Sequence, residues 1–180
     1  MIILVGASAS GKTEVAKRLF TRYGLKKVIT HTTRIIRPSE TRGVDYHFVS
    51  REEFFNLKEK GIFVETALYN GNYYGTSFAE VGDDKVLIVE PHGLAAFKNL
   101  KDPRIVAFFL ETSATIRRQR MHLRGDEEDI IKSRLADDEQ AFSQEFIAIA
   151  DYALCTDDLT IDQVARYIYE TYQKHLRKFQ

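Results

Sequence analysis

Hydrophobic and polar positions follow the rhythm of an α/β fold. Three short apolar runs, at residues 2–5, 86–89 and 105–110, lack the two-residue alternation of a half-exposed strand. Continuous runs of this kind are typical of parallel strands that are buried on both faces. Helical patterns lie between them, so the chain is predicted to have a parallel sheet flanked by helices.

Four segments carry helical signals. Residues 12–23 have one apolar face with Val15 and Leu19. Ser50, followed three residues later by Glu53, predicts a capping box at a helix start. Asp126 is expected to cap a long helix, and residues 161–176 to form the last one. The apolar seam of the long helix would comprise Ile131, Leu135, Phe142 and Phe146.

One stretch interrupts this rhythm. Residues 29–80 place Thr, Tyr and Phe in short extended segments, with turn signals at residues 37–39, at 70–72 and at Gly75. This composition predicts a small mixed or antiparallel lobe inserted into the α/β core. The sequence shows no repeat, low-complexity segment or Pro/Gly/Ser linker, so we expect one domain of 180 residues.

Composition narrows the functional class. With 26 Lys+Arg and 26 Asp+Glu the formal net charge is 0, which argues against nucleic-acid polymers and anionic membranes as partners. The apolar runs fall far short of the ~20 residues that span a bilayer. The first residues lack the basic region of a signal peptide. The single cysteine, Cys155, suits a reducing compartment, so a cytoplasmic location is expected.

The neutral total is a cancellation of local charges. Residues 26–46 hold five Lys/Arg against two acids, and residues 117–124 hold four arginines and no acid. Residues 126–129 offset these with four acids. Two compact positive sites of this size suit nucleotides better than a polyanion.

The most specific local motif is a phosphate loop at residues 6–13. It reads Gly6, Ala7, Ser8, Ala9, Ser10, Gly11, Lys12 and Thr13. The glycines allow a tight turn that points N–H groups at phosphate oxygens, and the following helix presents its positive end. Lys12 would reach the β- and γ-phosphates of ATP, and the Thr13 hydroxyl would bind Mg²⁺. The motif follows a buried strand and opens a helix, which predicts nucleotide binding.

Two further features lie in the inserted lobe. Arg34 and Arg37, with hydroxyl residues beside them, could hold a phosphate or carboxylate bidentately. By themselves they could equally form a solvated basic loop. Glu65 stands on an otherwise apolar strand, where an unpaired buried carboxylate would be costly. The alternative is a surface strand with a solvated Glu65.

The last feature is an arginine cluster. Arg117, Arg120 and Arg124 have the spacing of one helical face, and Arg134 follows on the next helix. Arginines on a mobile segment can close over phosphates and stabilise transition-state charge. The alternative is a solvated face whose arginines pair with the acids at 126–129.

Taken in this order, the motifs closely resemble guanylate kinase, a nucleoside-monophosphate kinase family with a P-loop core. The resemblance runs from residue 2 to about residue 158. Its most specific strings are Thr-Thr-Arg at 32–34, Gly-Val-Asp-Tyr-His-Phe at 43–48 and Gly-Asn-Tyr-Tyr-Gly-Thr at 71–76. The family transfers the γ-phosphoryl group of ATP to GMP and requires Mg²⁺. The resemblance therefore implies small-molecule substrates, ATP and GMP, in purine nucleotide metabolism.

The resemblance also implies a division of the chain. The core would comprise residues 1–28, 81–115 and 150–180, with an acceptor-binding lobe at 29–80 and a lid at 116–149. ATP would bind residues 6–13. Residues 156–158 correspond to a segment near the adenine, where Thr156 replaces the usual Asn.

Roles for individual side chains are carried over by motif. The grip on the GMP phosphate would be Arg34, Arg37, Tyr46 and Tyr74, with Glu40 beside the arginines. The guanine readers would be Thr30, Glu65 and Thr76. The catalytic set would comprise Lys12, Arg34 and the lid and neighbouring arginines Arg120, Arg124 and Arg134.

The chain departs from the family pattern after its central strand. Ile88 and Glu90 stand where the family has two aspartates. We expect Glu90 to contact GMP and to be a second candidate Mg²⁺ ligand besides Thr13. His31 replaces a small hydroxyl residue beside the acceptor site, where we expect a packing role.

The chemistry of guanine supports this assignment. Guanine presents N1–H and an exocyclic amine side by side, so one carboxylate such as Glu65 can accept both, whereas adenine would leave it unpaired. Two alternatives stay open at the sequence level. One is a guanylate-kinase-like kinase of another small phosphorylated acceptor, such as ribose bisphosphate. The other is a non-catalytic module that binds a phosphopeptide. The oligomeric state is not indicated.

Overall fold

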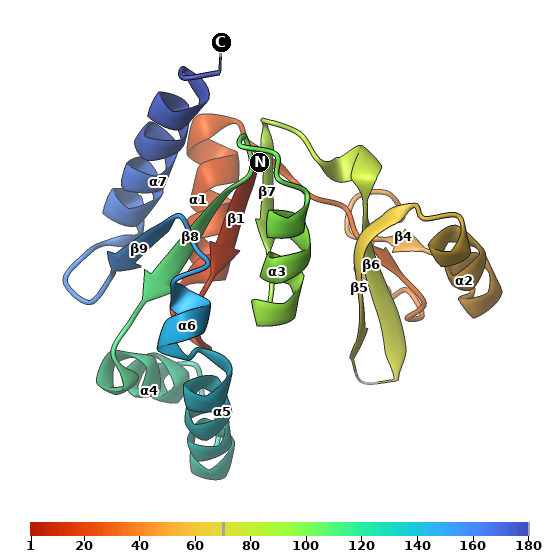
Figure 1. The fold of residues 1–180 in the computed structure, drawn as a ribbon. Helices are drawn as coiled ribbons and strands as arrows, with labels where there is room; N and C mark the ends of the chain where they lie inside the picture. The colour runs from red at the N-terminus through yellow and green to blue at the C-terminus, as the bar shows by residue number, and fades with distance from the viewer. Residues whose placement is uncertain (70, 180) are drawn as a thin grey trace.

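A five-stranded parallel sheet forms the centre of the molecule (Figure 1). The computed structural model describes residues 1–69 and 71–179. Within them the sheet has the order β2-β7-β1-β8-β9, and every neighbouring pair is parallel. Its strands are β1 (Ile2–Val5), β2 (Lys26–Lys27), β7 (Lys85–Ile88), β8 (Val106–Glu111) and β9 (Tyr152–Cys155). The predicted parallel sheet is confirmed.

Helices cover both faces of this sheet, as its apolar strands predict. Alternate residues of β1 face opposite sides: Ile2 and Leu4 pack with α1 (Lys12–Tyr23) and α7 (Ile161–Leu176). Ile3 and Val5 pack with α3 (Pro91–Asn99). The result is a three-layer core in which all four β1 side chains are fully buried.

The helix predicted at 161–176 has those bounds, and the structure adds its start signal. The Thr160 hydroxyl accepts from the N–H of Gln163, whose side chain accepts from the N–H of Thr160. This capping box was not identified from the sequence. The edge strands β2 and β9 were not found from hydrophobic pattern either: β2 is exposed, and β9 is short and buries only alternate residues in part.

Residues 29–80 form the second sheet, with order β4-β3-β6-β5 (Figure 1). The sheet is mixed, since β3 pairs with β4 in parallel but with β6 antiparallel. At the start of the covering helix the Ser50 hydroxyl accepts from the N–H of Glu53, which is the Ser50 half of the predicted capping box. Of the predicted turn at 70–72, Asn70 lies outside the described residues. The elements are β3 (His31–Thr32), β4 (His47–Phe48), α2 (Arg51–Glu59), β5 (Phe63–Tyr69), β6 (Asn72–Ser77) and the 3-10 helix η1 (Phe78–Glu80).

The segment between β8 and β9 is helical, with the helix expected at the arginines and with a break in the long helix predicted after Asp126. It consists of α4 (Ala114–Leu123), α5 (Glu128–Ala141) and the short α6 (Gln144–Ile147). The break falls at Phe142, which leaves the helical conformation and packs on Phe109 of β8. Burial of this ring replaces continuation of the helix.

The predicted cap of this segment is also corrected. Glu127 occupies the N-cap position of α5 and makes no side-chain cap hydrogen bond. The carboxylate of Asp126 is bound instead by Arg124 and Arg134. Two guanidinium groups offer this carboxylate several charge-assisted hydrogen bonds, so the arginines decide the position of Asp126.

No helix among residues 1–69 and 71–179 is long and apolar enough to cross a membrane.

Candidate functional site

The loop between β1 and α1 has the backbone of a phosphate cradle. Gly6 has φ of 153°, and a Cβ there would lie 2.7 Å from the carbonyl oxygen of Leu110. Ala9 and Gly11 have φ of 62° and 96°, in the left-handed region. This conformation, at a helix N-terminus, points N–H groups toward a bound anion.

Lys12 is held inside this cradle. Its Nζ donates to the carbonyl oxygens of Gly6 at 2.5 Å and Ala7 at 2.9 Å. Burial lowers the pKa of Lys12, and the carboxylates of Glu90 and Asp138 oppose that shift. The ammonium group is therefore pre-positioned over the loop, surrounded by acceptors that a phosphate could replace.

A cavity of about 530 Å³ lies against the loop. Arg120 and Arg124 line it, and Arg120 Nη1 donates to the carbonyl oxygen of Ala9 at 3.1 Å. The opposite wall comes from the start of α7. The lining residues are Ala9, Ser10, Gly11, Lys12, Thr13, Glu14, Arg120, Arg124, Leu159, Thr160 and Ile161. We call this the donor cavity.

The arginines of the cluster bind three different parts of the structure. Arg120 lies over the phosphate loop, whereas Arg124 and Arg134 converge on Asp126. Arg117 turns into the protein and pairs with Asp138 at 2.7 Å. The expected single arginine face is therefore wrong for Arg117, because its fork finds a buried carboxylate on α5. The alternative of pairing with the following acids holds for Arg124 and Arg134.

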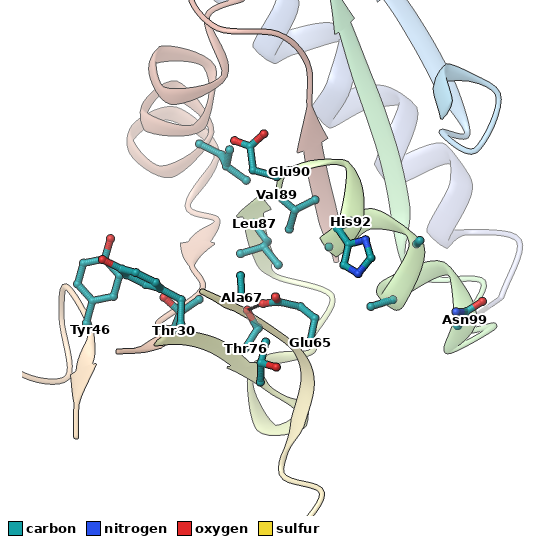
Figure 2. A pocket seen from close by; sticks show the side chains of 16 residues that line it. Thr30, Tyr46, Glu65, Ala67, Thr76, Leu87, Val89, Glu90, His92 and Asn99 are labelled. Atoms are coloured by element: carbon teal, nitrogen blue, oxygen red, sulfur yellow. Dashed lines mark hydrogen bonds between the residues drawn. The ribbon is translucent and has the colours of Figure 1, made fainter. Parts of the chain in front are cut away.

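A second cavity, of about 520 Å³, opens between the mixed sheet and α3 (Figure 2). Figure 2 shows Glu65 and Thr76 on the side of the mixed sheet and Glu90 and His92 on the opposite side. The lining residues are Thr30, Tyr46, Glu65, Thr66, Ala67, Tyr74, Thr76, Leu87, Ile88, Val89, Glu90, His92, Gly93, Ala95, Ala96 and Asn99. We call this the acceptor cavity.

Glu65 is the central polar group of the acceptor cavity. The Thr76 hydroxyl donates to its Oε1 at 2.7 Å, across the antiparallel pair of β5 and β6. Burial raises the pKa of Glu65, while the Thr76 hydrogen bonds and the charge of His92 partly oppose the shift. A half-buried carboxylate with a fixed orientation and free acceptor capacity suits recognition of a ligand with paired N–H donors.

The predicted phosphate grip is brought together in part. Tyr46 and Tyr74 line the acceptor cavity, and Arg34 lies 5.4 Å from the Tyr46 ring centroid. Arg34 Nη2 donates to Glu40 Oε1 at 2.5 Å, and Glu40 holds the pKa of Arg34 above its usual value. Arg37 is exposed and outside the lining; its backbone N–H donates to Glu40 Oε2 at 2.8 Å.

The two cavities lie at the carboxyl ends of neighbouring strands, since the phosphate loop follows β1 and Glu90 follows β7. Glu90 lines the acceptor cavity, and its charge acts on Lys12 of the donor cavity. Ile88 also lines the acceptor cavity but offers no oxygen ligand. In parallel sheets ligands bind at the carboxyl ends of the strands, which is where both cavities lie.

One lining residue, His92, was not assigned a role from the sequence. It stands at the start of α3, and only the position of that helix opposite β5 brings it toward Glu65. His31, by contrast, lies outside the lining and packs against His47 and Phe63, with ring centroids 4.6 and 5.2 Å away. Burial lowers the pKa of His31, which agrees with a packing role.

Thr156 faces the protein interior. Its hydroxyl lies 2.6 Å from that of Thr112 and donates to the carbonyl oxygen of Glu111 at 3.1 Å. Asp157 accepts from the N–H of Ser113 at 2.9 Å. These residues fix the loop before α7, and the next residues, from Leu159, line the donor cavity.

A divalent cation would find oxygen ligands here but no complete protein cage. Thr13 offers a hydroxyl in the donor cavity, and Glu90 offers a carboxylate near Lys12. Among residues 1–69 and 71–179 no group of three His, Cys, Asp or Glu side chains is placed to hold a metal. This donor set fits Mg²⁺, which usually binds through one or two side chains, water and substrate phosphates.

Known proteins are similar to this chain in sequence and in fold. Residues 1–171 match the family model described as guanylate kinase. A guanylate kinase of Desulfotalea psychrophila is 36% identical over 170 residues, covering 88% of this chain and 82% of that protein. One from Neisseria gonorrhoeae is 35% identical over 167 residues, covering 88% and 80%.

A solved structure extends the likeness to three dimensions. The crystal structure of guanylate kinase from Anaplasma phagocytophilum superposes with a TM-score of 0.64 at 25% identity. The superposition covers 97% of this chain and 84% of the other.

Proposed function

The chain belongs to the guanylate kinase family, and we propose that its donor cavity binds ATP and its acceptor cavity binds GMP. Its reaction is ATP-dependent phosphorylation of GMP, which yields ADP and GDP. The observation that best supports the division of labour is the position of the two cavities at the carboxyl ends of the neighbouring strands β1 and β7. We expect a phosphoryl group held in the donor cavity to pass to an acceptor held in the acceptor cavity.

We propose that the donor side works by positioning and charge. Lys12 would exchange the carbonyls of Gly6 and Ala7 for phosphate oxygens of ATP, and loop N–H groups would hold the same oxygens. Arg120 would neutralise charge that develops during transfer. Phosphoryl transfer needs little covalent chemistry from the protein, so no nucleophilic side chain is required.

On the acceptor side, Glu65 would read the base. With Thr76 holding one oxygen in place, its carboxylate would accept from guanine N1–H and the exocyclic amine. Arg34, Tyr46 and Tyr74 would hold the GMP phosphate, with Glu40 keeping Arg34 in position. The acceptor oxygen would thereby point at the donor cavity in line for attack.

Thr13 and Glu90 would hold Mg²⁺ together with the ATP phosphates. Bound there, the ion would neutralise phosphate charge in the transition state.

Two structural features support a kinase over a module that only binds. The phosphate loop keeps its left-handed turns, and Lys12 lies within it. The relatives reported above are all named guanylate kinase, so neither a kinase of a different acceptor nor a phosphopeptide-binding module is favoured. We further propose a cytoplasmic location, where both nucleotides are available.

The test is a coupled assay of ADP release with ATP and Mg²⁺ against GMP, AMP, CMP and UMP. We expect kcat/KM for GMP to exceed that for the other three by at least about 10⁴-fold. Discrimination of this size is typical when the wrong substrate leaves a buried polar group of the site without a hydrogen-bond partner. Glu65→Gln should reduce this preference, because an amide cannot accept both guanine donors. The exposed Glu59→Gln, in α2, is the matched control. Equal turnover of GMP and AMP by the unaltered chain would refute the assignment.

A further inference from the structure

We propose that Asp138 is a positioning residue of the ATP site, which anchors the phosphate loop through Ser8 and joins it to the base of the lid through Arg117. By the base of the lid we mean the first turn of α4 and the last turn of α5. This inference rests on the proposed assignment of the phosphate loop to ATP. It gives a role to Asp138, which the sequence motifs leave without one, and a different role to Arg117.

The contacts converge on one carboxylate. Asp138 Oδ2 accepts from the N–H of Ser8 at 3.0 Å, and Oδ1 accepts from the Ser8 hydroxyl at 3.2 Å. Arg117 Nη1 donates to the same Oδ2 at 2.7 Å. Residues 117 and 138 are only 8% and 9% exposed. Three segments far apart in the sequence therefore meet in a buried network.

Arg117 extends the network to the sheet. Its Nε donates to the carbonyl oxygen of Thr112, the residue that follows β8. The Thr112 hydroxyl in turn lies 3.5 Å from the carbonyl oxygen of Ser10, inside the phosphate loop. The loop is thus held on two sides, from α5 through Asp138 and from the end of β8 through Thr112.

Stability alone does not account for this pair. Desolvation offsets most of the attraction in a buried ion pair, and well-packed apolar side chains of similar volume are often as stabilising or more so. An apolar pair could not, however, accept the N–H of Ser8. The carboxylate at 138 thus supplies something specific to the phosphate loop.

The neighbouring backbone gives an independent reason for an anchor. Ala9, next to Ser8, has φ of 62°, a left-handed conformation that a non-glycine residue adopts only at a cost. Such a conformation persists where its surroundings hold it. The two hydrogen bonds from Ser8 to Asp138 fix the residue before the strained one, and Arg120 binds the carbonyl oxygen of Ala9 itself.

The network lies at the base of the lid, and this position has a second consequence. Arg117 and Asp138 lie near the two ends of the α4–α5 pair, and both are tied to the nucleotide loop. Movement of the lid would therefore pivot about residues that contact the ATP site. The state of the phosphate loop and the position of Arg120 and Arg124 would be coupled mechanically.

The test uses a double variant that removes both charges together, Arg117→Leu with Asp138→Ala. This change leaves no unpaired buried charge, so the protein should fold, which thermal unfolding verifies. The matched control is Arg118→Leu with Asp137→Ala, which removes the same charges from exposed neighbours on the same two helices. Both are assayed with ATP, Mg²⁺ and GMP.

We expect the double variant to raise KM for ATP about tenfold, the loss typical of a hydrogen bond to a charged group, and to lower kcat. KM for GMP should stay within about twofold of the unaltered chain, and amide exchange at Ser8 should accelerate. The control should match the unaltered chain in all four quantities.

A folded double variant with unchanged ATP kinetics and unchanged Ser8 exchange would overturn the proposal. Equal changes in both KM values would do the same, since they would indicate a general structural effect. Absence of GMP-dependent turnover in the unaltered chain would instead contradict the proposed function, so the two failures are distinguishable.

Discussion

Four of the arginines assigned to phosphate chemistry already have a partner in the structure. Arg34 pairs with Glu40, Arg124 and Arg134 share Asp126, and Arg120 binds the carbonyl oxygen of Ala9. Partners of this kind hold the side chains near their working positions, so less conformational entropy is lost when a nucleotide arrives.

Lys12 gives the sharpest prediction at the residue scale. Lys12→Ala should lower kcat at least about 100-fold, because a preorganised charge at the transferring group is lost. GMP affinity, measured by calorimetry, should be nearly unchanged, because Lys12 lines the donor cavity and not the acceptor cavity. Lys17→Ala is the control, because Lys17 is exposed on the same helix and pairs with Glu14. A parallel loss of GMP affinity would contradict this role.

Glu65 predicts a dependence on pH. Its pKa is raised above the ordinary value of 4.5, mainly by burial. Only the ionised carboxylate accepts both guanine donors, so KM for GMP should rise as pH falls through the raised pKa. The acid limb should be absent from the KM profile of Glu65→Gln. A KM for GMP that is constant with pH in the unaltered chain would count against Glu65 as the reader.

The same shift predicts an effect on stability. A carboxyl group whose pKa is higher in the folded than in the unfolded state destabilises the fold once pH exceeds both values. Glu65→Gln should therefore raise the melting temperature at pH 7–8, and the gain should disappear below pH 4.5. If Glu65→Gln is more stable but selects guanine less well, then Glu65 lowers the stability of the fold while it serves binding, as is common at binding sites.

At the scale of elements, the core helices obey their hydrophobic pattern. Helix α7 buries Val164, Ala165, Ile168 and Tyr172 against α1 and the sheet. Helices α4 and α5 do not, because the apolar seam predicted there is divided by the turn at Phe142 and their arginines bind carboxylates. Helices α1 and α7 were therefore easier to predict than the helices at the end of the sheet, whereas α3 was not predicted although it packs on the sheet.

Ile168→Ala tests the packing of α7. Ile168 is fully buried, so the change should lower the free energy of unfolding by about 2–5 kcal/mol in a denaturant titration. Glu170→Ala, exposed on the same helix, should change it by less than about 0.5 kcal/mol. A small effect at Ile168 would mean that α7 contributes little to the core.

At the scale of the whole molecule, the zero net charge reflects pairing between local clusters. Basic residues of the lid and lobe meet acids from the same regions, so the positive sites are small and lie around the two cavities. The mixed sheet and the lid reach the core from different sides in Figure 1. Ligands that bridge both cavities should draw these parts together, which would exclude water from the transfer.

Small-angle X-ray scattering tests this closure. With GMP, Mg²⁺ and a non-hydrolysable ATP analogue present, the radius of gyration should fall by about 1 Å, as expected for a lobe closure. In the control, AMP replaces GMP, and most of the decrease in the radius of gyration should then be lost. An identical radius in both mixtures would show that closure does not depend on the acceptor.

The sequence by itself determined the parallel sheet, the phosphate loop, the inserted lobe and the last helix. These depend on local signals: continuous apolar runs, the Gly-x-x-x-x-Gly-Lys-Thr spacing and helical periodicity. The motifs also placed Glu65 and Thr76 in one site, and their hydrogen bond agrees with that.

Only the tertiary structure decided which charges meet. Asp138 lies 130 residues from Ser8 and 21 from Arg117, and no spacing rule connects them. His92 lies opposite Glu65 only because α3 packs beside β5. Asp126 binds two arginines instead of capping the helix as the sequence predicted. Long-range pairing of polar groups depends on how the elements pack, and a side chain binds the strongest partner that packing brings within reach.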